Sequence, residues 1–187
     1  MSEKYRFDTM SLHSGHVPDK ETGSRAVPIY QTTSYVFKDT DEAAALYNME
    51  VGGHLYTRIS NPTIATLEQR LASLDGGVSC VACSSGMAAM HLVVTAICSS
   101  GDHIVASNKM YGANINLLQH TMTRFGIKTD FVNPNDLEEI EKSIKPNTKL
   151  VFGEVIGNPG LDVMNVPEVA KICKKKNVPL AIDATFN

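Results

Sequence analysis

The chain has 187 residues, of which 43% are hydrophobic and 20% charged, with a net charge of -3 and a pI of about 6.0. This balance is typical of a globular domain with a real hydrophobic core and argues against intrinsic disorder. The weak negative charge gives no reason to expect nucleic acid or an anionic membrane as a partner. No apolar run is long enough for a membrane span, and residues 1–8 lack the apolar stretch of a secretory signal, so we expect a cytoplasmic protein.

Residues 1–60 are irregular and contain many glycines and prolines. One short helix is predicted over residues 41–49, with Asp41 as N-cap. A long irregular segment is unusual in a compact domain and is often functional. We therefore interpret residues 1–60 as an N-terminal arm that reaches a neighbouring subunit.

A regular pattern begins at Asn61, which is expected to cap a helix that starts at Pro62 and ends at Gly76. Further helices are predicted over residues 86–98, 112–124, 136–144 (capped by Asn135) and 166–176. Strands are predicted over residues 78–83, 103–107, 127–132, 149–155 and 178–183. Strands rich in Val and Ile that alternate with helices predict an α/β fold, a three-layer sandwich with a mostly parallel sheet.

The four cysteines and six histidines do not form a recognisable metal site. Cys80 and Cys83 form a C-x-x-C, but Cys98 and Cys173 do not supply the second ligand pair that zinc requires. Without an export signal we expect no disulfide framework. We predict no metal and interpret Cys80 and Cys83 as core residues of the strand at 78–83.

Ligands of parallel α/β sheets bind beyond the carboxyl ends of the strands. After residue 83, Ser85, Gly86 and Met87 open a helix, where exposed amides and the helix dipole favour an anion such as phosphate. The turn is neither G-x-G-x-x-G nor a Walker loop, so a nucleotide-binding fold lacks its fingerprint. Taken alone, the turn is better explained as a tight turn with a small residue.

Three further turns carry polar or aromatic side chains. Tyr111 could stack on a planar ligand, Asn158 offers an amide, and Asp183 follows a buried strand where a carboxylate is costly unless paired, for example with a protonated ring nitrogen. In the arm, Tyr56 and Arg58 offer a hydroxyl and a planar fork for phosphate. Each also has a plain structural explanation: a rim tyrosine, a loop turn, a helix cap or a surface arginine.

Together these motifs resemble the Cys/Met-metabolism family of pyridoxal-phosphate enzymes. The resemblance runs from Phe7-Asp8-Thr9 to Asp183-Ala184-Thr185-Phe186 and is strongest at residues 56–63 and 84–87, Tyr111-Gly112, Asn158-Pro159 and Asp183. It implies the aspartate aminotransferase type of fold, with residues 61–187 as the first part of the large cofactor-binding domain and the C-terminal domain absent.

The resemblance also implies roles for the residues at these motifs. Pyridoxal 5'-phosphate would be held at its phosphate by Ser85 and by the amides of Gly86 and Met87, and from the neighbouring subunit by Tyr56 and Arg58. Tyr111 would be the catalytic residue that stacks on the ring and moves protons, Asp183 the partner of the ring nitrogen, and Asn158 a neighbour of the phenolic oxygen.

Within the family, residues 23–37 and the stretch Ile156-Gly157-Asn158-Pro159 are similar to O-acetylhomoserine sulfhydrylases. Position 113 is Ala113, where methionine γ-lyases typically place a cysteine. Departures from the usual pattern at Ala113, Asn114 and Ala184 concern substrate preference rather than the cofactor. The implied activity is replacement of the acetate of O-acetylhomoserine by sulfide or methanethiol, in a homotetramer with shared active sites.

The family's Schiff-base lysine is expected beyond Asn187, so the 187-residue chain alone is expected to be inactive. Two alternatives stay open: a γ- or β-lyase of the same family that acts on cystathionine or methionine, and a non-catalytic fragment that lacks the lysine. A nucleotide-binding protein is disfavoured because the glycine fingerprint is missing.

Overall fold

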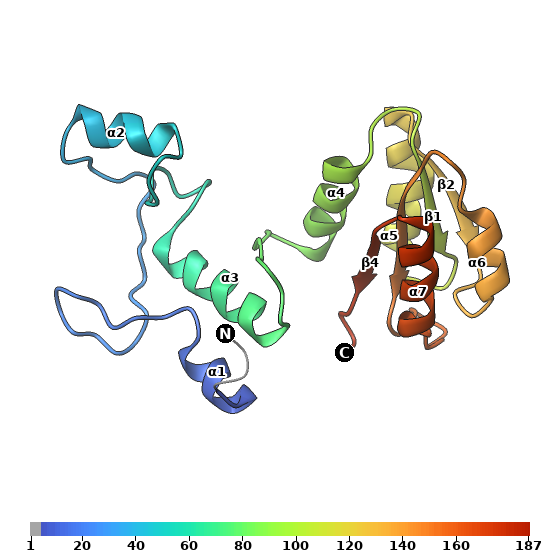
Figure 1. Ribbon diagram of the computed structural model, residues 1–187, viewed down its shortest axis with the longest axis horizontal. Helices are drawn as coiled ribbons and strands as arrows, with labels where there is room; N and C mark the ends of the chain where they lie inside the picture. Colours follow the sequence, from blue (N-terminus) through green and yellow to red (C-terminus); the bar gives the residue numbers. More distant parts are fainter. Residues whose placement is uncertain (1–4) are drawn as a thin grey trace. The chain divides into compact units, whose positions relative to one another are not determined.

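The computed structural model describes residues 5–187, and its internal contacts divide the chain into two compact units, Met1–Ala82 and Cys83–Asn187 (Figure 1). The boundary defined by packing therefore falls after residue 82, later than the change in sequence pattern at residue 60. The role of residues 1–60 as an arm toward a neighbouring subunit stays a prediction.

The first unit contains three helices: α1 (Phe7–His13), α2 (Thr40–Tyr47) and α3 (Pro62–Leu74). Helix α3 begins as predicted, because the Asn61 side chain accepts a hydrogen bond from the Thr63 amide at 2.9 Å and Pro62 occupies the first turn. The predicted cap of α2 was wrong. Asp39 is extended and accepts from the Glu42 amide at 2.8 Å, which leaves Asp41 inside the first turn.

The strand predicted over residues 78–83 is not formed, and the segment is irregular. Val78 and Val81 are exposed to 106% and 75%, so the apolar side chains that suggested a buried strand are not buried. Cys80 and Cys83 are only half-buried, which makes their assignment as core cysteines wrong. The physical reason is that the sheet is built from residues 103–183 alone, and residues 78–83 join no ladder of it.

Four parallel strands form the sheet of the second unit, in the order β2-β1-β3-β4. Their bounds are β1 His103–Ser107, β2 Lys128–Val132, β3 Thr148–Glu154 and β4 Leu180–Asp183. The predicted strands agree with these to within two residues. Since all four strands are parallel, their carboxyl ends meet at one edge of the sheet.

Helix α4 (Gly86–Ile97) precedes β1, and the strands are connected by α5 (Gly112–Asn116), α6 (Leu137–Ser143) and α7 (Val166–Lys176). The helix predicted over residues 112–124 is α5 continued by a π-helical turn η1 (Leu117–Thr121) and a 3-10 turn η2 (Met122–Phe125), closed by Gly126 with φ 78°. Asn135 was the wrong cap for α6. Asp136 accepts from the Glu139 amide at 2.9 Å instead.

Alternate strand residues enter two separate cores, which confirms the α/β fold with helices on both faces of a parallel sheet (Figure 1). On one face, Ile104 and Leu150 pack with residues of α4, α5 and η1. On the other face, Val105 and Val151 pack with residues of α6 and α7. Because both faces of the sheet are buried, the strands are rich in Val and Ile and do not alternate between apolar and polar residues.

Candidate active site at the carboxyl edge of the sheet

A hollow of about 380 Å³ lies at the carboxyl edge of the sheet, within the second unit. This volume is within the range of sites for small ligands. The hollow brings together six residues that the sequence predicted for a site: Ser85, Gly86, Met87, Tyr111, Asn158 and Asp183. Their side chains and amides come from turns as far as 98 residues apart (183 - 85).

The N-terminus of α4 forms one wall of this hollow. The Ser85 hydroxyl oxygen caps the helix by accepting from the Ala88 amide at 3.1 Å, which leaves its own hydrogen available to a ligand. The amides of Gly86 and Met87 are the first two of the helix and have no partner within it. No atom lies within 4 Å of the place where a Cβ on Gly86 would stand, so the glycine leaves open space beside these amides. This arrangement fits an anionic group such as phosphate.

Tyr111 lines the hollow directly before α5 and is 48% exposed. Its amide donates to Glu154 Oε1 at 2.7 Å, which fixes the backbone from which the ring projects. A half-exposed ring on a fixed backbone is available to stack on a planar ligand.

Asp183 is the last residue of β4 and is half-buried. Its Oδ1 accepts from the Thr185 amide at 2.9 Å, whereas Oδ2 accepts only one long hydrogen bond, at 3.4 Å from Asn114 Nδ2. Oδ2 therefore keeps the capacity to accept from a protonated ring nitrogen.

Sequence reasoning missed Glu154 and Asn114, although both line the same hollow. Glu154 is 5% exposed and ends β3, and Asn114 is 2% exposed in the first turns of α5. A signal for Glu154 was present, because it ends a buried apolar strand just as Asp183 does. The sequence singled out Asn114 only as a departure from the family pattern, and its role at the two carboxylates gave no local signal, since these partners are 40 and 69 residues away.

Tyr56 and Arg58 lie in the first unit, where the Arg58 guanidinium carbon stands 5.8 Å from the centre of the Tyr56 ring. They are not among the residues that line the hollow of the second unit. Their reach to a phosphate on a neighbouring subunit stays a prediction.

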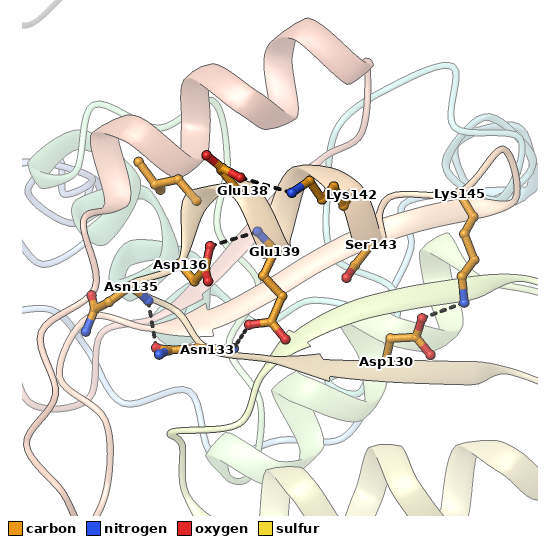
Figure 2. Close-up of a pocket in the computed structure, with 10 residues that line it drawn as sticks. Asp130, Asn133, Asn135, Asp136, Glu138, Glu139, Lys142, Ser143 and Lys145 are labelled. Atoms are coloured by element: carbon orange, nitrogen blue, oxygen red, sulfur yellow. Dashed lines mark hydrogen bonds and ion pairs between the residues drawn. The ribbon is translucent and has the colours of Figure 1, made fainter.

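A second hollow runs beside α6, but its polar groups bind one another (Figure 2). Asn133 and Glu139 are joined by a hydrogen bond of 2.9 Å, Lys142 pairs with Glu138 at 3.0 Å, and Lys145 pairs with Asp130. This groove is open, both of its lysines are paired with carboxylates, and its remaining carboxylates, Asp136 and Glu139, accept backbone hydrogen bonds. It lacks the combination of free amides, ring and carboxylate found at the carboxyl edge.

The opposite edge of the sheet holds a buried polar cluster around His103, the first residue of β1. His103 Nδ1 lies 2.8 Å from Thr148 Oγ1, and Nε2 lies 3.2 Å from Asp130 Oδ2. Burial, with a smaller effect of the Lys145 charge, lowers the pKa of His103. A hydrogen bond from Lys145 lowers the pKa of Asp130.

Among residues 5–187, no group of three or more His, Cys, Asp or Glu side chains is arranged to hold a metal ion. Burial raises the pKa of Cys98 and of Cys173 to about 11, so both stay protonated thiols near neutral pH. Within the same described range, no helix has both the length and the apolar character needed to cross a bilayer.

Fold and hollow together define an α/β domain whose hollow, at the carboxyl edge of a parallel sheet, fits a phosphorylated, planar ligand. Comparison with known proteins narrows this class. Residues 8–187 match the family described as Cys/Met metabolism PLP-dependent enzyme. The chain therefore belongs to this family, and its cofactor is pyridoxal 5'-phosphate.

Two curated relatives match nearly the whole chain. The chain is 45% identical over 186 residues to an O-acetyl-L-homoserine sulfhydrylase of Leptospira meyeri, covering 100% of the chain and 42% of that protein. It is 42% identical over 184 residues to a homocysteine synthase of Schizosaccharomyces pombe, covering 98% of the chain and 43% of that protein. The chain thus spans less than half the length of these relatives.

Solved structures share the fold. A Campylobacter jejuni protein assigned as O-acetylhomoserine (thiol)-lyase, which carries a pyridoxyl-lysine phosphate, matches with TM-score 0.92 and 38% identity over 96% of this chain and 44% of that one. A cystathionine γ-lyase of Lactobacillus plantarum, in complex with L-serine, matches with TM-score 0.86 and 30% identity over 96% of this chain and 45% of that one.

Proposed function

We propose that the protein carrying this chain replaces the acetate of O-acetylhomoserine with sulfide or methanethiol, giving homocysteine or methionine plus acetate. The observation that carries this proposal is the 45% identity with an O-acetyl-L-homoserine sulfhydrylase along the full length of the chain. The position of Ala113, directly after Tyr111-Gly112, supports a sulfhydrylase over a methionine γ-lyase.

The residues of the hollow fit pyridoxal phosphate in kind and in number. Ser85 and the amides of Gly86 and Met87 would hold the phosphate, and Tyr111 would cover one face of the ring. Asp183 would keep a proton on the ring nitrogen, and Asn158 would lie near the phenolic oxygen. The bound cofactor supplies an electron sink for the carbanions of the reaction.

The chain's own groups then have distinct tasks in the reaction. Asp183 holds a positive charge on the ring by accepting its N–H, which requires a carboxylate at the strand end. The Tyr111 hydroxyl is the group that moves a proton beside the leaving acetate. The helix N-terminus orients the cofactor by its phosphate and takes no part in bond making.

We infer that the assembled protein is a cytoplasmic homotetramer in which Tyr56 and Arg58 of one subunit reach the phosphate held by Ser85 of another. The test is to mix two inactive variants, R58A and D183A, after dissociation and reassociation. In a mixed pair, one site receives intact Arg58 and intact Asp183 and recovers activity. Activity that stays absent in verified mixed oligomers would show that the sites are not shared.

The activity itself is tested with the cofactor-loaded protein, O-acetylhomoserine and sulfide, following homocysteine and acetate in equal amounts. A lyase of the same family, favoured as second candidate by the cystathionine γ-lyase match, would instead release an α-keto acid and ammonia without added sulfide. Borohydride treatment with intact-mass measurement tests the third possibility. If no cofactor becomes covalently attached and the mass is that of 187 residues, the chain is a non-catalytic fragment.

A further inference from the structure

Glu154 is a buried carboxylate that lines the site. It is 5% exposed, and no lysine or arginine among residues 5–187 lies within ion-pair distance of it. A buried carboxylate is costly unless hydrogen bonds replace the lost water. Its stability in this place therefore depends on the donors around it.

The donors to Glu154 come from two different loops of the site. Oε1 accepts from the Tyr111 amide at 2.7 Å and from Asn114 Nδ2 at 3.1 Å, and Oε2 accepts from the Asn158 amide at 3.3 Å. One side chain thus joins the loop that carries the proposed stacking ring to the loop that carries the proposed amide. Hydrogen bonds to a carboxylate are stronger than those between neutral groups.

Asn114 connects Glu154 to the second carboxylate of the site, Asp183. Glu154 and Asp183 are paired in register on neighbouring strands β3 and β4, so both side chains lie on the same face of the sheet. Asn114 Nδ2 donates to Glu154 at 3.1 Å and to Asp183 Oδ2 at 3.4 Å, one hydrogen for each carboxylate. The opposite orientation of the amide would set its oxygen against two carboxylates, so this orientation is dictated by charge.

We propose that Glu154 and Asn114 are positioning residues that hold Tyr111, Asn158 and Asp183 as one hydrogen-bonded unit around the cofactor. Neither side chain has to touch reacting atoms. Glu154 fixes the two loop backbones, and Asn114 holds the Asp183 carboxylate at a set distance from Glu154 in spite of their like charges. The inference rests on the proposed roles of Tyr111 and Asp183. It concerns the affinity for the cofactor and does not depend on which substrate is bound.

The test measures cofactor binding in the absence of substrate. The cofactor-free protein carrying this chain is titrated with pyridoxal phosphate, and the visible circular dichroism of the bound form is recorded. E154A and N114A each remove hydrogen bonds to a charged group, so we expect the dissociation constant to rise about 10-fold or more, with a weaker dichroism band. E154Q keeps the Oε1 acceptor for Tyr111 and Asn114 and loses only the Oε2 acceptor for the Asn158 amide, so it is expected to bind within about 3-fold of the parent.

Glu139 offers a matched control in the same unit. It too is a glutamate that accepts a backbone N–H beyond a strand end, from Asn133 at 2.9 Å, but it lies in the groove beside α6 (Figure 2). E139A should lower thermal stability slightly and leave the cofactor dissociation constant unchanged. The E139A control therefore separates the general effect of losing a glutamate that holds a loop backbone from a specific effect on cofactor binding.

Two results would overturn the inference. If E154A and N114A lower the melting temperature but bind the cofactor within about 2-fold of the parent, the two residues are structural only. If E154Q is as defective as E154A, the acceptor at Oε1 is not what holds the site, and the proposed link through Tyr111 and Asn114 is wrong. Should E154A fail to fold, E154Q and N114A still decide the question. A protein that binds cofactor as expected but makes no homocysteine would refute the proposed function and leave this inference standing.

Discussion

The two units of the chain differ in how many of their apolar side chains are buried. In the part of the chain that the structure describes, every buried hydrophobic residue lies in the second unit, in two clusters on the two faces of the sheet. Among residues 5–82, Asn61 is the one buried residue, and Val36 and Ile29 are 99% and 83% exposed. A sheet with helices on both faces can support a site by itself, whereas an extended segment with exposed apolar side chains needs another surface to cover it.

The largest expected effect is on the free energy of unfolding, and it tests whether the second unit provides most of the stability. Ile104, on β1, is fully buried, so I104A should lower the free energy of unfolding by about 2–5 kcal/mol. V36A, at a 99% exposed position, should change it by less than about 0.5 kcal/mol in a dissociated subunit. Urea unfolding of both variants gives the comparison. Equal effects would mean that the two units share one core.

The Asn61 side chain makes hydrogen bonds that join separate segments of the first unit. It caps α3, and its Nδ2 also donates to the Tyr30 carbonyl at 2.8 Å. N61A should cost about 1–2 kcal/mol and be felt in the first unit only, as faster amide hydrogen exchange of α3. N165A removes the weaker cap of α7, where the Glu168 amide lies 3.4 Å from Asn165 Oδ1, and should cost less. Faster exchange in β1 or β3 of N61A would contradict the independence of the units.

Gly86 and Gly112 are the first residues of α4 and α5, and neither has an atom within 4 Å of a built Cβ. Only Gly86 lines the hollow. A methyl group there would occupy the space beside the amides proposed to bind the phosphate, so G86A should weaken pyridoxal-phosphate binding about 10-fold with little change in stability. G112A is the control and should bind like the parent. Equal binding by both variants would place the phosphate elsewhere.

The smallest effect is a pH dependence of stability from the cluster around His103. Because the pKa of His103 is lowered in the folded state, the unfolded state binds more protons below about pH 6.5, and stability falls as the pH decreases. Asp130, whose pKa is also lowered, adds to the loss only at lower pH. One group contributes at most about 1.4 kcal/mol per pH unit. H103N should flatten the stability curve between pH 7 and 5, and an unchanged slope would rule out His103 as its source.

The sequence was informative wherever a local rule decides the structure. The cap at Asn61, the helix over residues 166–176 and the four sheet strands follow from side-chain patterns that act over a few residues. The strand at 78–83 failed because an apolar run does not reveal whether a neighbouring strand is present to pair with it. The caps of α2 and α6 failed because two acidic or amide residues stand close together, and backbone angles decide which one turns back.

The same distinction holds for the site. Turns at the ends of parallel strands could be found from the sequence, because the fold brings strand ends together regardless of detail. The network of Glu154 and Asn114 depends on which loop amides face a carboxylate 40 or more residues away, and no local pattern encodes that.

The strand order β2-β1-β3-β4 also fixes when the site can exist during synthesis. The strand made first, β1, lies between β2 and β3, so one of its edges stays open until residues 148–154 have left the ribosome. No pair in this sheet is a hairpin, and each must close over a helix, which makes its assembly slow. Of the four strands of this sheet, Glu154 and Asp183 end the two that are made after β1 and β2. During synthesis, the segment with the amides of Gly86 and Met87 therefore leaves the ribosome well before the carboxylates of Glu154 and Asp183 that line the same hollow.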